Sequence, residues 1–169
     1  MKRGAAWTIY HPNGKGTGSA VKMELHPAHG VVAGSMFVTL APQKTIGERT
    51  AESTIAPTFD WNRAICLKMD IVELTQIIQV LRGCQESIED GKGLFHRSAE
   101  ASAVIKFEHR IEPVPGYMLD VCKRPTDGEL TRVSFFFRPV EAATLGLALE
   151  GSMVELAFGI NPSMDRDGE

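Results

Sequence analysis

The residues best suited to chemistry in this sequence are cations and aromatic rings that alternate with apolar residues along predicted strands. Positive side chains can meet phosphates, and flat rings can stack on unpaired bases. An unpaired nucleic acid requires both, because its backbone is charged and its bases are exposed. The candidate cations are Lys15, Lys22, Lys68, Lys106 and Arg132, and the candidate stacking residues are Tyr10, Phe37, Trp61 and Phe136.

Alternation of apolar and polar residues predicts the strands that would present these side chains. In the first half the pattern runs through residues 21–25, 36–40 and 65–69. One apolar face per strand is typical of a half-buried sheet. After residue 69 the apolar spacing becomes that of a helix. Asp70 and Glu73 have the spacing of a capping box at its start, and Gly83 is placed to end it.

The second half of the chain repeats this order. Alternation predicts strands near residues 103–111, 117–123 and 133–137. Pro139 suits the first position of a helix, and the Ala- and Leu-rich segment after it extends to about Phe158. A shift of 68 residues places Ile65 on Val133 and Leu67 on Phe135, which indicates two copies of one unit.

The predicted fold class is α+β, because runs of strands followed by a helix do not build a parallel doubly wound sheet. Each repeat is expected to supply antiparallel strands and then a helix (ββββα twice). We expect one domain over residues 1–160, with repeats at 5–83 and 99–158 and a flexible tail at 161–169. Polar composition predicts a mobile loop at 45–57 and an acidic linker at 85–93.

The overall charge of the chain conceals an uneven distribution. Its 169 residues include 18 Lys and Arg against 21 Asp and Glu, and the net charge of -3 by itself argues against nucleic-acid binding. Residues 1–69 nevertheless carry +4 and residues 102–138 carry +1. Ten of the twelve aromatic residues lie in these two segments. The predicted β-strands therefore carry the cations and aromatic rings that a single-stranded nucleic acid requires. Aromatic rings that fill a hydrophobic core would give the same pattern.

Composition narrows the class of protein further. With 43% hydrophobic and 23% charged residues, the chain is globular rather than disordered or fibrous. No apolar run approaches the ~20 residues of a membrane span, and the residues after Met1 do not form an export segment. We expect a cytoplasmic protein that does not associate with membranes. Cys66, Cys84 and Cys122 are scattered and odd in number, which favours reduced thiols.

No motif predicts catalysis, a cofactor or a metal site. The sequence contains no nucleophile elbow and no zinc-protease helix. Lys15 and its neighbouring glycines precede a predicted strand, whereas a P-loop lysine begins a helix. His26 and His29 lie in a predicted turn without a carboxylate or thiolate at ligand spacing. We expect a protein that is not an enzyme.

Several segments resemble the Whirly single-stranded DNA-binding proteins. The similarity begins at residues 8–10, continues through Lys15 and Gly16 to residues 19–27, and recurs in the second half. Compared with the Lys-Gly-Lys-Ala-Ala-Leu motif of that family, residues 11–14 are inserted and Thr17 replaces the second lysine. The remaining similar segments are residues 38–42, 47–49, 60–61, 95–96, 105–108 and 116–117.

The resemblance implies two four-stranded sheets packed crosswise, with helices that close the core and mediate a tetramer. It also implies single strands lying on the sheets, with bases between aromatic and apolar side chains. We therefore expect a largely sequence-independent single-stranded DNA-binding protein that acts in transcription or DNA maintenance and forms a homo-oligomer, a dimer or tetramer. The alternatives are an RNA-binding protein of this fold and a structural or protein-interaction module that no longer binds nucleic acid.

Overall fold

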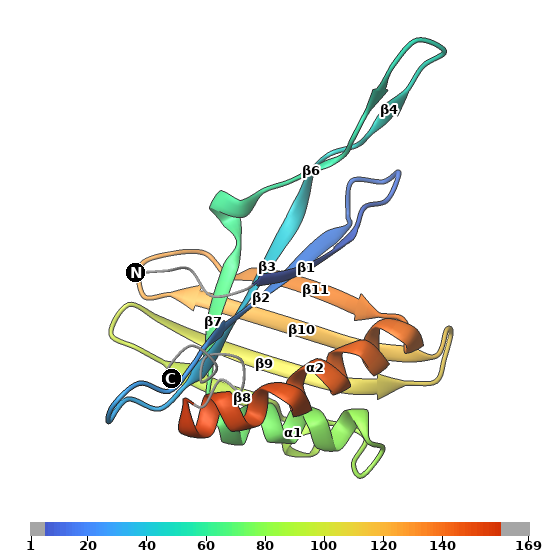
Figure 1. Ribbon diagram of the computed structural model, residues 1–169. Coiled ribbons are helices and arrows are strands. Elements are labelled where there is room, and N and C mark those ends of the chain that lie inside the picture. The colour runs from blue at the N-terminus through green and yellow to red at the C-terminus, as the bar shows by residue number, and fades with distance from the viewer. Residues whose placement is uncertain (1–5, 160–169) are drawn as a thin grey trace, which may run out of the picture.

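The computed structural model describes residues 6–159, which form two antiparallel sheets, a projecting two-stranded ribbon, two α-helices and two short 3-10 helices (Figure 1). The strands of the first sheet are β1 (Ala6–His11), β2 (Ser19–His26), β3 (Ser35–Thr45), β6 (Thr58–Phe59) and β7 (Ile65–Met69). Their order is β1-β2-β3, and both β6 and β7 pair with β3. The predicted antiparallel strands of the first half are confirmed.

The second sheet has four strands in the order β11-β10-β9-β8. Figure 1 shows these strands crossing those of the first sheet, with both helices along the side between the sheets. The predicted α+β class is therefore confirmed. The bounds are β8 (Leu94–Arg97), β9 (Ala101–Arg110), β10 (Gly116–Pro125), β11 (Thr131–Phe137), α1 (Ile71–Leu81) and α2 (Pro139–Phe158).

The first half departs from the predicted succession of four strands and one helix. Two short strands, β4 (Glu48–Arg49) and β5 (Thr54–Ile55), pair with each other between β3 and β6. They form a hairpin within the segment predicted as a mobile loop at residues 45–57. Figure 1 shows this ribbon projecting beyond both sheets. Its strands are two residues long, too short for an alternating pattern to reveal them.

The predicted acidic linker at residues 85–93 is packed against the second sheet. It contains a short 3-10 helix (Ile88–Gly91), and the Ile88 side chain is completely buried. The backbone N–H of His109 in β9 donates to the carbonyl of Glu86 at 2.8 Å. One apolar residue among several acidic ones anchors this segment. The predicted tail at 161–169 lies outside the described residues.

The helices begin and end as their sequence predicts. The Asp70 carboxylate accepts from the Glu73 backbone N–H at 2.9 Å, and Glu73 accepts from the Asp70 backbone at 3.0 Å. Gly83, with φ of 71°, directly follows Arg82, the C-terminal cap of α1. Pro139 is the first residue of α2. Neither helix has the length and apolarity required to cross a membrane.

The core lies between the inward faces of the two sheets and the helices. Alternate residues of each strand enter it, so that the cross-strand pair Val38 of β3 and Leu67 of β7 belongs to the same buried core as Leu119 of β10. Phe107 and Phe135 are each 1% exposed. Because the side-chain period of a strand is two, this burial leaves the other set of side chains outward on both sheets.

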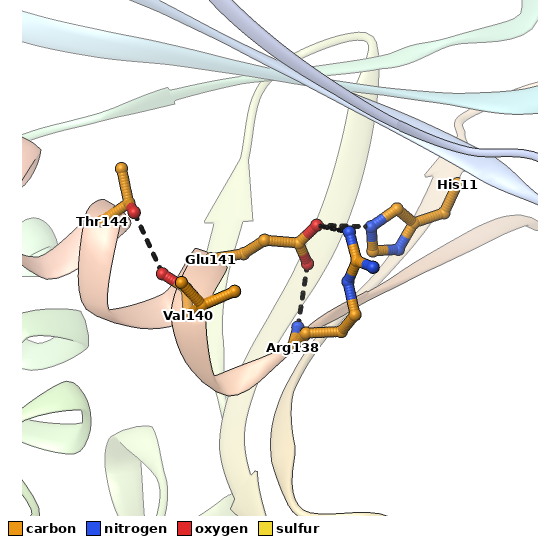
Figure 2. A network of polar contacts seen from close by, with 5 residues as sticks. All are labelled: His11, Arg138, Val140, Glu141 and Thr144. Atoms are coloured by element: carbon orange, nitrogen blue, oxygen red, sulfur yellow. Dashed lines mark hydrogen bonds and ion pairs between the residues drawn. The ribbon is translucent and has the colours of Figure 1, made fainter.

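A polar network joins the two halves of the chain at the start of α2 (Figure 2). The Nε2 atom of His11, at the end of β1, lies 2.8 Å from Oε1 of Glu141. The backbone N–H of Arg138 donates to Oε2 of Glu141 at 2.9 Å, and the Arg138 guanidinium bonds Oε1. The His11 ring also stacks on Phe135, with ring centroids 4.5 Å apart. The first sheet is thereby attached to α2 and β11.

Replacement of Phe107 by Ala should destabilise the fold strongly. The ring contacts the inward residues of both halves, and its loss leaves a cavity that costs about 3–5 kcal/mol. Urea denaturation followed by circular dichroism measures the change. Leu130→Ala, at a side chain 53% exposed, is the control and should stay within about 0.5 kcal/mol of the wild type. Equal stability losses in the two variants would contradict the assigned core.

The Glu141 network predicts a loss of stability in acid. Burial opposes ionisation of this carboxyl, but hydrogen bonds from Arg138 and His11 outweigh it and lower its pKa from 4.5 to about 2. A pKa lowered by folding stabilises the native state above the unfolded-state pKa. That stability is lost as the pH falls from 4.5 towards 2. Urea midpoints across this range should fall less steeply for Glu141→Gln than for the wild type, whereas Glu129→Gln should keep the wild-type profile.

Candidate nucleic-acid interface

Both α-helices pack on the inward sides of the sheets, so neither α1 nor α2 covers the outward sides, whereas the short 3-10 helix Trp61–Arg63 lies beside β3. We call these surfaces the first face (outward side of β1, β2, β3 and β7) and the second face (outward side of β8 to β11). Eight of the nine predicted site residues lie on these faces or at their margins, and Lys15 lies in the loop between β1 and β2. The structure thus gathers the predicted residues on two surfaces.

The first face carries aromatic rings among lysines. Strand pairing places Phe37 of β3 between Glu24 of β2 and Lys68 of β7. Lys22, in the next row, has its Nζ atom 5.9 Å from the centre of the Trp61 ring, a cation–π arrangement. Lys68 is exposed and forms no ion pair within residues 6–159. The first face can therefore present rings to bases and an unpaired cation to a phosphate.

Two rings of the first face were missed by sequence reasoning. Phe59 lies 5.4 Å from Tyr10, centroid to centroid, and the Tyr10 side chain is 53% exposed. The ring of His26 lies 4.5 Å from that of Phe37. Phe59 belongs to a strand of only two residues, which is too short to be predicted. His26 was predicted to lie in a turn, but it is outward on β2, two residues after Glu24. The alternation of outward residues along β2 could therefore have identified His26.

The second face differs in its charges. Lys106 of β9 and Ser134 of β11 lie on either side of Asp120 in β10. The Arg132 guanidinium bonds both carboxylate oxygens of Asp120, with Nε to Oδ1 at 2.8 Å. Burial opposes ionisation of Asp120, but bonds from Arg132 and Ser134 outweigh it and lower the carboxyl pKa. Arg132, predicted to meet a phosphate, is already paired with a carboxylate.

Apolar side chains also lie on the second face. Phe136 lies opposite Met118 across the β10–β11 pair, and both are partly exposed. Phe95 of β8 is 64% exposed and follows the outward phase of its short strand. Met118 is thus the apolar neighbour of Phe136, whereas Phe95 lies on the opposite edge strand of the sheet.

A cleft of about 760 Å³ joins the two faces between β7 and β8. Lys68 of the first face and Phe95 of the second line it, together with Lys123. In its wall, Nε2 of His96 lies 2.5 Å from Oε1 of Glu73. The cleft brings cations and an aromatic ring from both halves of the chain to one concave surface.

Lys15 is held in place by a buried glutamine. The Gln43 side chain accepts from the backbone N–H groups of Asn13 at 2.9 Å and Gly18 at 3.0 Å. It also donates to the Asn13 carbonyl at 3.0 Å. These bonds close the loop between β1 and β2 and fix it to β3, while Lys15 stays exposed at its tip.

Comparison with known proteins identifies the fold. No protein-family model and no curated protein sequence matches the chain. Among solved structures, WHY1 from Arabidopsis thaliana aligns with a TM-score of 0.74 and 14% identity, covering 94% of this chain and 88% of that one. WHY3 from Arabidopsis thaliana aligns at 0.70 and 16%, covering 92% and 90%. The plant transcriptional regulator PBF-2 aligns at 0.69 and 17%, covering 92% and 84%.

The chain has a Whirly-like fold. Each alignment covers more than nine-tenths of this chain. The family resemblance expected from the sequence is thereby confirmed at the level of the fold. Within the Whirly-like frame, the first sheet of this protein has five strands rather than the four that the resemblance implied.

The bonds of Gln43 predict how the Lys15 loop responds to mutation. Gln43→Ala removes the acceptor of the Asn13 and Gly18 amides, so both should exchange with solvent roughly five- to tenfold faster, as expected for one lost hydrogen bond. Hydrogen exchange followed by NMR measures these rates. Gln79→Ala on α1 is the matched control and should leave them unchanged. Unaltered exchange in Gln43→Ala would show that the loop is held by other contacts.

Proposed function

We propose that this Whirly-like protein binds single-stranded DNA on its two outward faces and in the cleft between them, largely independently of base sequence. The observation that carries the proposal is strand register, which sets exposed cations beside partly exposed rings on uncovered sheets. Lysines track a phosphate backbone, and each base stacked on a ring contributes about 1–3 kcal/mol. The resemblance to the Whirly single-stranded DNA-binding proteins supports the same ligand.

The contacts follow from the geometry of each candidate. Lys15, Lys68 and Lys106 form no ion pair within the described chain and meet phosphates directly. Lys22 pairs with Glu24 at 2.6 Å, and Arg132 pairs with Asp120, so each must exchange a carboxylate for a phosphate. The rings that stack on bases are Tyr10, Phe37, Trp61 and Phe136, joined by Phe59 and Phe95.

The proposal favours a single strand over a duplex. Specific duplex recognition places a helix or a two-stranded ribbon in a groove. Both described helices are net acidic, and their exposed side chains are largely apolar. Open sheets with rings instead suit bases that are free to stack.

The wider role that we propose is that of a non-enzymatic, cytoplasmic factor in transcription or DNA maintenance, acting as a homo-oligomer. The exposed apolar side chains of α2 support the oligomer. They are Val140 at 70%, Leu147 at 74%, Val154 at 52% and Phe158 at 73% exposure. Such a surface on one helix is typical of a protein–protein contact.

A protein-interaction module is the second candidate, favoured by the two carboxylates, Glu24 and Asp120, that neutralise cations on the faces.

Fluorescence anisotropy with labelled oligonucleotides of one sequence, as single-stranded DNA, RNA and duplex DNA, separates the candidate functions. We expect tightest binding to single-stranded DNA and a steep loss with salt. Equal affinity for RNA would indicate an RNA-binding or unselective protein, because only the 2′-hydroxyl distinguishes the two. If no oligonucleotide binds at low salt, the protein-interaction module becomes the favoured function.

Single substitutions should separate the charge and stacking contributions. Lys68→Ala should weaken binding and lower the slope of log K against log salt by about 0.7, whereas the exposed Lys92→Ala should do neither. Tyr10→Ala should cost about 1–3 kcal/mol of binding energy with an unchanged salt slope. An effect of Lys92→Ala equal to that of Lys68→Ala would place the phosphates elsewhere.

A further inference from the structure

The two outward faces share one construction but differ at their centres. In the first face, Phe37 and Thr39 occupy the middle strand β3. In the second face, the central strand β10 carries the carboxylate of Asp120. This carboxylate lies mid-strand, on the same outward side as Phe136 and Met118. A backbone phosphate crossing the second face would approach this negative charge.

Asp120 is surrounded by the groups that would otherwise bind that phosphate. Lys106 is its cross-strand partner on β9, where opposed Cβ atoms are about 4.5–5.5 Å apart. Arg132 of β11 bonds it through both guanidinium donors, and the Ser134 hydroxyl donates at 2.7 Å. A guanidinium and a hydroxyl bonded to one anion, with a lysine on the neighbouring strand, resemble the donor set that commonly binds a phosphate group.

We propose that Asp120 acts as an internal substitute for phosphate on the second face and lowers the affinity of this face for nucleic acid. The inference rests on the proposed function and concerns its regulation. While the carboxylate holds Arg132, an incoming phosphate must break a bidentate pair and approach a like charge. The backbone of the bound strand therefore runs mainly along the first face and the cleft, where Lys68 is unpaired. On the second face, Lys106 offers a phosphate contact weakened by the adjacent Asp120, and Phe136 and Phe95 contact bases.

The charge state of Asp120 supports a permanent effect near neutral pH. Its lowered pKa keeps the carboxyl ionised throughout the physiological range. The Asp120 side chain is only 15% exposed and is bonded by Arg132 and Ser134, although the Arg132 side chain is itself 63% exposed. The substitute is thus a fixed part of the face.

Asp120→Asn tests the inference, since it removes the charge and retains an oxygen acceptor for Ser134. If one additional phosphate contact becomes possible, affinity for single-stranded DNA should rise about fivefold at about 0.1 M salt. The slope of log K against log salt should steepen by about 0.7. Anisotropy titrations at several salt concentrations measure both. Ser134→Ala, which disturbs the same site without a change of charge, should bind like the wild type.

Glu150→Gln is the control for net charge. It also removes one carboxylate and releases one arginine, because Glu150 pairs with Arg82 at 2.7 Å between α2 and α1. The pair lies on the helices, and charges act over only about 10 Å at this salt concentration, so affinity should change less than about twofold. An equal gain in Glu150→Gln and Asp120→Asn would reduce the effect to overall charge and overturn the inference.

A double-mutant cycle identifies the residue that gains the contact. Arg132→Gln should have little effect in the wild type, where Asp120 neutralises Arg132, and should abolish the gain in the Asp120→Asn background. Wild-type binding with no gain in Asp120→Asn would overturn the inference and leave the proposed function standing. If neither protein binds any oligonucleotide, the proposed function fails and the inference fails with it.

Discussion

Burial of alternate side chains between two crossed sheets is the constraint on which the rest of the structure depends. Phe107, Phe135 and their neighbours fill one core that both sheets and both helices share. A strand that places one set of side chains in this core must direct the other set outward. The candidate site is thus a consequence of core packing: Lys22 and Phe37 are outward because Met23 and Val38 are inward.

The two halves of the chain are held in one orientation by polar contacts as well as by the core. The Ser19 hydroxyl donates to the Ser134 carbonyl at 2.7 Å, and His11 reaches Glu141 at the start of α2. These contacts cross from the first sheet to the second half of the chain. They keep the strands crossed, and the crossing brings β7 and β8 together around the cleft that joins the two faces.

The repeated construction does not produce two equivalent surfaces. On the first face Phe37 occupies the central strand between Lys68 and Glu24, the carboxylate that pairs with Lys22, whereas on the second face the carboxylate lies on the central strand itself and pairs with Arg132. The positive charge counted along the strands is therefore partly cancelled within the sheet itself. A net charge describes how many cations a segment holds, while cross-strand pairing decides which of them are available to a ligand.

Local rules in the sequence determined the elements that have strong periodicity or end signals. The strands around residues 21–25, 36–40 and 133–137, the capping box of Asp70 and the Pro139 helix start follow from neighbours a few residues apart, and so did the outward position of Lys68. Tertiary structure alone decided the ribbon at residues 48–55, the burial of Ile88 and the pairing of Arg132 with Asp120. The ribbon strands and the 3-10 helix that contains Ile88 are too short to produce a recognisable hydrophobic pattern. Arg132 and Asp120 are brought together only by the register of two paired strands, which the sequence pattern does not reveal.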